Sequence, residues 1–209
     1  DWQKTAKVMA RFANMPEPEY HEDWEYLKSA KAASAFDISR YEVKQIDMER
    51  IPQIFHQRGL SDETVRQFAP FVFLIRDRRN GNFDGYNIGF PYTDTDNQVK
   101  GYEVRGYGGY KSKAAGTDSS SAAWVADFSG GNPEAVRCVF FCESAFDAMA
   151  FHQMNRNQLH PDVALVSLGG TFSDNQITGV MNRFPNAKAF DCFDNDIAGR
   201  IYGLRMIGL

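Results

Sequence analysis

The last third of the chain alternates between short apolar runs and longer segments whose apolar residues recur every three or four positions. Each run is followed by one such segment: 137–142 by 145–155, 163–168 by 173–184, and 187–193 by 198–209. Apolar runs that alternate with helical periodicity in this way are typical of a parallel sheet covered by helices on both faces. The pattern therefore predicts an α/β domain over residues 136–209.

The middle of the chain, residues 71–130, has a different pattern. Aromatic and β-branched residues alternate there with turn signals, at 80–81, 84–85, 94–97 and 106–109. Short strands between such turns predict a small antiparallel β subdomain. The small polar stretch 116–121 is expected to be an exposed loop, and 130–133 a linker to the α/β domain.

Residues 1–70 predict a helical N-terminal segment, with helical spacing at 24–33 and 51–57. Gly59 is typical of a helix end, and Ser61 of the N-cap of a next helix. Two helices joined by a short turn also occur in DNA-reading proteins, but the second helix offers only Arg66 and Gln67 to a groove. Packing within the protein is therefore the favoured interpretation.

The composition is that of an ordinary globular protein, with 209 residues of which 43% are hydrophobic and 24% charged. No apolar run approaches the length of a membrane span, so no membrane partner is expected. Cys138, Cys142 and Cys192 lie inside apolar runs, which indicates reduced core thiols and a cytoplasmic protein. The net charge of −4 excludes a globally basic nucleic-acid coat, although it leaves room for a local basic groove.

Acidic residues follow two of the predicted strands directly. Glu143 comes after the run 137–142, and Asp194 and Asp196 come after the run 187–193. The carboxyl ends of parallel strands collect ligands, and neighbouring strands lie only about 4.8 Å apart. Three carboxylates at one edge suit Mg²⁺, with Glu143 as a ligand or as a general acid or base. The competing interpretation is three acids that only stabilise helix N-termini.

Other assignments of the same residues are weaker. A calcium loop that starts at Asp194 would need Glu at its twelfth position, where the sequence has Arg205. A phosphatase with an aspartyl nucleophile is conceivable, but nothing marks its acid–base partner. Asp147, four residues after Glu143, either orients the site through a neighbouring ligand or caps its own helix.

A basic and aromatic segment spans residues 100–113. It holds four cations against one acid and interleaves them with three tyrosines. Cations contact phosphates and aromatic rings accept stacked bases, so the segment predicts contact with nucleic acid or nucleotides. The alternative is a solvated sheet edge protected by charge. The four cations are Lys100, Arg105, Lys111 and Lys113.

Taken in order, these motifs resemble the Toprim domain, which DnaG-type bacterial primases, topoisomerases and some nucleases share. The resemblance rests on Glu143-x-x-x-Asp147, Leu168-Gly169 and Asp194-x-Asp196-x-Ala198-Gly199. Upstream, the segments 57–61, 90–91, 101–105 and 111–119 resemble the catalytic core of the primases. The chain is also similar to primase-related Toprim proteins of mobile elements.

The resemblance implies a Toprim-like sheet with helices on both faces and Mg²⁺-dependent nucleotidyl transfer that makes primers in DNA replication. Glu143 would be the acid–base or metal-linked carboxylate, and Asp194 and Asp196 would hold Mg²⁺, with Mn²⁺ as an alternative. Arg105, Lys111 and Lys113 would contact template or nucleotide phosphates. The implied partners are single-stranded DNA and nucleoside triphosphates, together with a helicase or other replication or mobilisation proteins.

The chain departs from the family pattern in two respects. No zinc-binding Cys/His module precedes the core, so template selection is unsupported. The sequence also stops inside a predicted helix, before the strand expected to close the fold. Nuclease or strand-transfer chemistry on the same carboxylates, and an inactive nucleic-acid-binding module, remain alternative functions.

Overall fold

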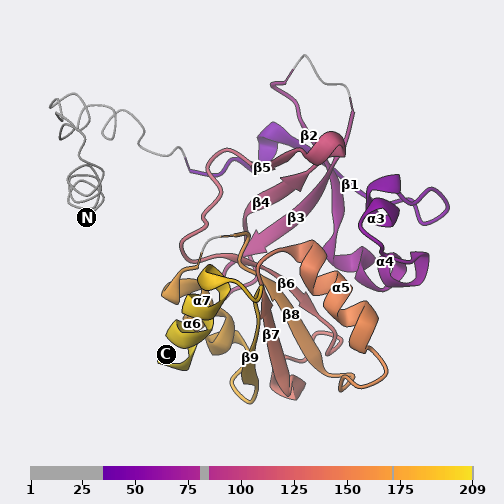
Figure 1. The fold of residues 1–209 in the computed structure, drawn as a ribbon. Helices are drawn as coiled ribbons and strands as arrows, with labels where there is room; N and C mark the ends of the chain where they lie inside the picture. Colours follow the sequence, from indigo (N-terminus) through magenta and orange to yellow (C-terminus); the bar gives the residue numbers. More distant parts are fainter. Residues whose placement is uncertain (1–34, 81–84, 171, 209) are drawn as a thin grey trace, which may run out of the picture. The chain divides into compact units, whose positions relative to one another are not determined.

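The strands of this chain form one mixed sheet in the computed structural model (Figure 1). The structure describes residues 35–80, 85–170 and 172–208, which belong to one compact unit. The strands are β1 (Tyr41–Gln45), β2 (Phe73–Asp77), β3 (Asn87–Thr93), β4 (Val99–Arg105), β5 (Lys111–Lys113), β6 (Ala123–Asp127), β7 (Cys138–Cys142), β8 (Val163–Ser167) and β9 (Lys188–Cys192). The helices are α3 (Gln53–Gln57), α4 (Asp62–Phe68), α5 (Ala145–Asn155), α6 (Asp174–Arg183) and α7 (Ile197–Ile207), with single 3₁₀ turns η1 (Ile38–Arg40), η2 (Ala69–Phe71), η3 (Tyr107–Gly109) and η4 (Pro133–Ala135).

The C-terminal half follows the predicted alternation of strands and helices. Each observed boundary of β7, α5, β8, α6, β9 and α7 lies within two residues of the prediction. β7 is the central strand and pairs in parallel with β8 on one side and β9 on the other. Because these three strands run in the same direction, the turns that follow them meet at one edge of the sheet.

The antiparallel half is continuous with this sheet. The path through the whole sheet is β1-β2-β3-β6-β8-β7-β9, and β4 and β5 extend from β3 as an antiparallel branch. β6 joins the two halves, since it pairs antiparallel with β3 and with β8. The basic segment on β4 and β5 is thereby attached to the sheet that carries the acidic residues.

The prediction of a helical segment over 1–70 is wrong at Tyr41–Gln45, which forms β1. The five residues pair antiparallel with the whole of β2, so their conformation is set by partners 28 to 36 positions away. The end of the segment is confirmed: Gly59 has a φ of 74°, and the Ser61 side chain caps α4 by accepting a hydrogen bond from the Thr64 N–H. The helix expected at 24–33 lies outside the described residues.

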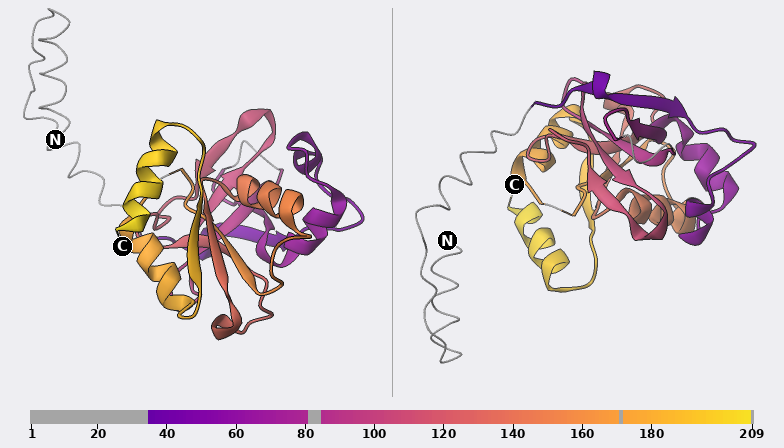
Figure 2. Two further views of the ribbon diagram at one scale, coloured as in Figure 1. Left: turned by 60° about the horizontal axis from the view of Figure 1, so that its bottom comes forward. Right: turned by 90° about the horizontal axis from the view of Figure 1, so that it is seen from above.

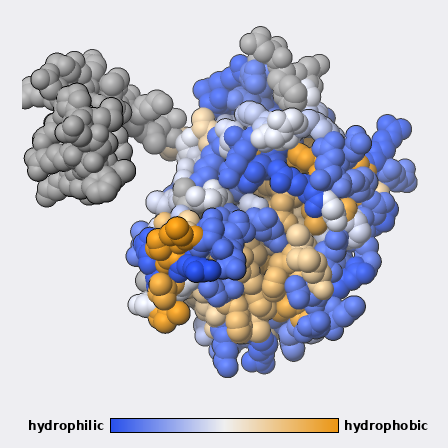
Figure 3. Space-filling view, in the orientation of Figure 1, coloured by the Kyte–Doolittle hydropathy of each residue, from blue (hydrophilic) through white to orange (hydrophobic). Residues whose placement is uncertain are grey.

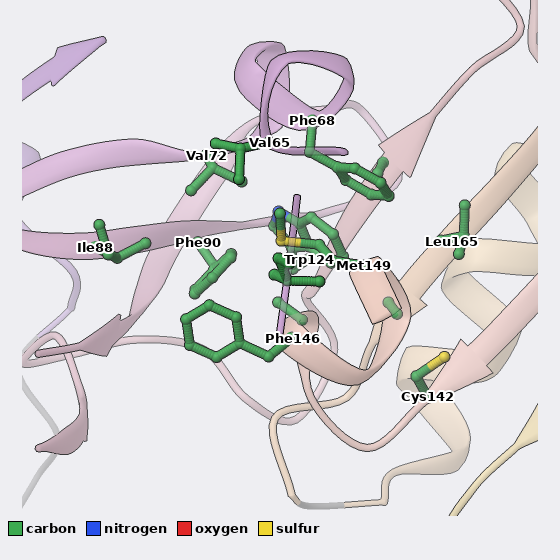
Figure 4. Close-up of a cluster of buried hydrophobic side chains, with 14 of the residues drawn as sticks. Val65, Phe68, Val72, Ile88, Phe90, Trp124, Cys142, Phe146, Met149 and Leu165 are labelled. Carbon is green, nitrogen blue, oxygen red and sulfur yellow. The ribbon is translucent and has the colours of Figure 1, made fainter. Parts of the chain in front are cut away.

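Helices cover both faces of the sheet, as predicted. The views of Figure 2 show α5 on one side of the C-terminal strands and α6 and α7 on the other. One apolar cluster packs α3, α4 and α5 against the first face, and a second packs α6 against the opposite face, with Met206 of α7 at its margin. Figure 4 shows the first cluster, in which Trp124, Phe68, Phe90 and Phe146 converge.

Trp124 lies at the centre of that cluster, where the two halves of the sheet meet. Its ring stacks on Phe68 at 6.1 Å between centroids and meets Phe90 edge-on at 5.7 Å. The indole N–H donates to the Phe71 carbonyl at 2.8 Å, so the polar atom of this buried side chain is satisfied. Burial of each large side chain here contributes about 1.5–3 kcal/mol.

The surface at α7 and β9 is less well covered. Figure 3 shows exposed hydrophobic residues along α7, and these are Ile197, Ile201, Leu204 and Ile207. β9 is an end strand of the sheet path among the described residues, and Phe190 on it is 41% exposed. No described helix combines the length and apolar composition that a membrane crossing requires.

Candidate active site

The turns after β7 and β9 bring Glu143 and Asp194 together. Cys142 and Cys192, the last residues of these strands, are register partners in the parallel pair, so the residues that follow emerge side by side. The Asp194 N–H donates to Glu143 Oε1 at 3.3 Å. The sequence-based expectation that these two acids meet at one edge of the sheet is therefore confirmed.

Asp196 is held by the start of α7. It occupies the N-cap, and its Oδ1 accepts a hydrogen bond from the Gly199 N–H at 2.8 Å. Gly199 has no room for a side chain, because a Cβ there would lie 2.0 Å from the Asp194 carbonyl oxygen. The Ala198-Gly199 pair thus allows α7 to begin directly against the acidic turn.

Asp147 lies in the first turn of α5, and its side chain contacts Ser144, the N-cap of that helix. The Ser144 hydroxyl donates to Asp147 Oδ2 at 2.6 Å, and the Asp147 N–H donates to Ser144 Oγ at 3.3 Å. The Asp147 carboxylate therefore holds the side chain of the helix cap. An orienting role for Asp147 at the acidic turn stays a prediction.

The acidic turn concentrates negative charge around Glu143. Burial raises the pKa of the Glu143 carboxyl above its usual range, the Asp194 N–H opposes this, and the nearby acids raise it further. These acids are Asp194, Asp196 and Asp147. A cation at the turn would relieve this repulsion, since a divalent ion favours the charged form of every carboxylate near it.

In the part of the chain that the structure describes, no three His, Cys, Asp or Glu side chains are grouped closely enough to hold a metal ion. Asp196 Oδ1 accepts from the backbone of α7, which leaves the carboxylates of Glu143 and Asp194, two residues in hydrogen-bond contact. Their oxygen atoms are the donor type that Mg²⁺ prefers, and Mg²⁺ commonly keeps several waters besides one or two carboxylates. The residues therefore fit a Mg²⁺ ion held by two protein ligands.

The turn after β8 connects the acidic site to the basic strands. The Leu168 N–H donates to the Cys142 carbonyl at 3.2 Å, and the Gly170 N–H donates to the Glu143 carbonyl at 2.9 Å. Gly169 and Gly170 both have positive φ, at 65° and 74°. A Cβ on Gly169 would meet the Tyr92 hydroxyl, and one on Gly170 would lie 3.3 Å from Lys111 Nζ. The Gly-Gly pair, a weak signal for a ligand site in the sequence, thus lies where the turn after β8 approaches β3 and β5 closely.

Three of the four predicted basic residues lie together on β4 and β5. Arg105 and Lys111 are register partners, and Glu103 is the partner of Lys113. Lys113 Nζ lies 5.6 Å from the centroid of the Tyr92 ring, and burial lowers the pKa of its ammonium group, with Lys111 acting in the same direction and Glu103 opposing. Lys100 is at the opposite end of β4 from Arg105 and pairs with Asp94 at 3.1 Å.

Glu103, the one acid among the four cations of this segment, is its most deeply buried charged residue. Glu103 is 1% exposed, and its Oε1 accepts from Arg105 Nε at 2.5 Å. The Tyr92 hydroxyl donates to Glu103 Oε2 at 3.4 Å. The spacing of two between Glu103 and Arg105 on a strand could have shown that they share a face, but the burial of that face depends on Tyr92 and the turn after β8.

Comparison with protein families agrees with this geometry. Residues 140–209 match the family model described as Toprim-like. The matched segment begins inside β7 and contains all four acids of the turn region. No curated protein sequence matches the chain.

Solved structures with a similar fold are primase catalytic domains. The primase domains of bacteriophage T7, in a complex with the lagging-strand DNA polymerase and an RNA/DNA hybrid, share 16% identity at a TM-score of 0.51, over 82% of this chain and 78% of that one. The T7 primase fragment shares 15% identity at a TM-score of 0.49, over 80% of this chain and 62% of that one. The E. coli primase catalytic core shares 20% identity at a TM-score of 0.45, over 73% of this chain and 57% of that one.

The fold is thus α/β with a Toprim-like C-terminal part, and it resembles the fold of the primase domains of bacteriophage T7. This chain spans about three fifths of the T7 primase fragment and of the E. coli core.

Proposed function

We propose that this protein is a primase-like nucleotidyltransferase that makes primers on single-stranded DNA with Mg²⁺. The observation that carries the proposal is the short path from the acidic turn to the basic strands. Gly170 donates to the Glu143 carbonyl on one side and lies next to Lys111 on the other. Negative groups that can hold a cation and positive groups that can hold phosphate are therefore separated by a single turn.

In this proposal Glu143 and Asp194 hold the cation, and Lys111 and Lys113 hold the phosphates of the incoming nucleotide or of the template. The cation would neutralise the charge that develops on the transferring phosphoryl group. Arg105 is neutralised by Glu103, so it contributes a fixed set of hydrogen-bond donors more than a free charge. Asp196 holds the start of α7 and thereby the backbone of the acidic turn.

Primer synthesis is the direct test. The protein, incubated with Mg²⁺, nucleoside triphosphates and single-stranded DNA templates, should produce short oligonucleotides that a denaturing gel resolves. Glu143→Gln and Asp194→Asn should each reduce the product at least a hundredfold, because both remove a carboxylate from the acidic turn. Glu134→Gln is the matched control, since Glu134 is exposed and belongs to η4.

If the wild-type protein makes no oligonucleotide on any template, the proposal is wrong. Cleavage of the template that depends on Glu143 and Asp194 would instead assign nuclease chemistry to the same turn.

A further inference from the structure

A pocket of about 270 Å³ lies next to Arg105. Its lining includes Leu74, Ile88 and Arg105, which follow one another across β2, β3 and β4 as register partners. Register partners project to the same face of a sheet, so these three side chains form one wall. Ile54 from the start of α3 adds a further apolar side chain.

The pocket has two exposed residues with groups that suit nucleic acid. Arg50 is exposed, and among the described residues it has no ion-pair partner. Tyr107 is 56% exposed in the turn between β4 and β5. Gly108 and Gly109 have positive φ, and the Gly106 N–H donates to the Tyr110 carbonyl at 2.9 Å, which closes this turn and fixes where Tyr107 stands.

Arg105 is fixed in the pocket wall by the buried carboxylate beneath it. It is 8% exposed, and its Nε and a terminal nitrogen both lie 2.5 Å from Glu103 Oε1. A guanidinium has five N–H donors, so this contact leaves others for a ligand. An arginine held in this way loses little side-chain freedom when it binds.

We propose that this pocket binds one unstacked base of a nucleic-acid single strand, with Tyr107 as the stacking surface and Arg105 as a fixed donor. An apolar wall, an exposed aromatic ring and arginines are the groups that grip single strands without reading sequence. The volume is below the roughly 300–1,000 Å³ of pockets for larger ligands, which suits a single base.

The position of the pocket extends the function proposed above, on which this inference rests. Arg105 is the register partner of Lys111. Lys111 lies next to Gly170, whose N–H donates to the Glu143 carbonyl. A strand with one base in the pocket therefore has its next phosphates beside the basic residues that lead to the acidic turn.

The experiment measures binding of a fluorescein-labelled 12-mer of deoxythymidine by fluorescence anisotropy, without Mg²⁺ or nucleotides. Tyr107→Leu should weaken binding about tenfold, because stacking of one base is lost. Tyr107→Phe should bind like the wild type. Phe190→Leu is the matched control, since Phe190 is an aromatic residue that is 41% exposed on β9 and does not line the pocket, and it should leave binding unchanged.

A second strand of equal length with abasic sugars separates base binding from phosphate binding. The Tyr107→Leu variant and the wild type should bind this strand equally. The proposal is overturned if Tyr107→Leu binds the deoxythymidine strand like the wild type, if it weakens binding of the abasic strand equally, or if Phe190→Leu has the same effect. Competition by thymidine monophosphate at the concentration of the strand would also overturn it, since the ligand would then be a free nucleotide.

Glu103→Gln tests the fixed arginine by a second route. The amide keeps the shape of the side chain but removes the charge that holds Arg105, so binding of the deoxythymidine strand should weaken several-fold while Tyr107→Phe does not. A primer-synthesis assay that fails while the Tyr107 effect is present would reject the proposed function and leave the pocket in place.

Discussion

At the scale of single residues, the acidic site depends as much on a glycine as on its carboxylates. Order along the chain was enough to place Glu143 and Asp194 together, because parallel strands bring their ends to one edge. It was not enough to show that Asp196 is a helix cap, since a cap depends on where α7 begins. Glu103 was missed for a related reason: its burial is produced by residues from distant segments of the chain.

Gly199→Ala should damage the acidic turn although alanine usually favours a helix. The added Cβ would lie 2.0 Å from the Asp194 carbonyl oxygen, so the turn must move. Thermal unfolding measured with and without Mg²⁺ should show that the wild type gains stability from the ion and the variant does not. Gly179→Ala in α6 is the control, because its Cβ would have only ordinary contacts, at 3.6 Å. Gly179→Ala should raise the free energy of unfolding by up to about 1 kcal/mol and should still be stabilised by Mg²⁺. If Mg²⁺ also stabilises Gly199→Ala, the ion does not depend on the acidic turn and the proposed metal site is wrong.

His152 should make the stability of the protein depend on pH. Its ring stacks on Phe128 at 4.9 Å and 8°, and its Nδ1 has no hydrogen-bond partner among the described residues. Burial lowers the pKa of His152 below its usual value, and Arg156 lowers it further. Since the unfolded chain then binds the proton more tightly than the folded one, the free energy of unfolding should fall as pH decreases below about 6.5.

Urea unfolding at pH 7 and pH 5 measures this effect. His152→Phe keeps an aromatic ring and removes the titrating group, so it should lose less stability than the wild type between the two pH values. The exposed His160 provides the control: His160→Gln should behave like the wild type. Equal losses for His152→Phe and the wild type would show that other groups cause the pH dependence.

At the scale of elements, local signals decided what could be predicted. α5 was predicted at its observed bounds, because the signal, apolar residues at helical spacing, lies within the helix itself. β1 was missed because a five-residue strand carries little local signal and gains its hydrogen bonds from β2. The pairing of β6 with β8 could not be predicted from sequence either, because the local sequence of a strand does not specify which distant strand it pairs with.

Phe146 should be the residue that docks α5. It is 5% exposed and meets Phe90 at 5.3 Å and Phe55 at 5.8 Å. Phe146→Ala should lower the free energy of unfolding by about 3 kcal/mol, because it removes a buried ring and leaves a cavity. Met154→Ala on the same helix, at a side chain that is 73% exposed, should change it by less than about 0.5 kcal/mol. Urea denaturation followed by circular dichroism measures both, and similar values for the two variants would contradict this docking.

At the scale of the whole molecule, the antiparallel and the parallel regions of the sheet share one hydrophobic core. The direct ladder between them is short, with only Tyr92–Trp124 and Thr93–Ala123 as register partners of β3 and β6. The rings of Phe68, Phe90 and Trp124 pack across this junction and join the helices of both halves. Packing of these rings therefore adds to the short backbone ladder in coupling the two halves.

The described residues should consequently unfold in one cooperative transition. A variant with Trp2→Phe and Trp24→Phe leaves Trp124 as the sole tryptophan, so its fluorescence reports the junction alone. Its urea transition should coincide with the transition measured by far-UV circular dichroism. Two separate midpoints would show that the antiparallel half and the Toprim-like half are independent folding units.

The outer edge of β9 has a consequence for the behaviour of concentrated protein. Its backbone amides and carbonyls on that side have no ladder partner in the described part of the chain. The helix that follows this strand in sequence, α7, has exposed isoleucines. Such an edge can take up a strand from a second molecule, and apolar residues nearby favour that encounter. Self-association, measured by light scattering, should therefore increase as the protein concentration rises, and Phe190→Lys should reduce it.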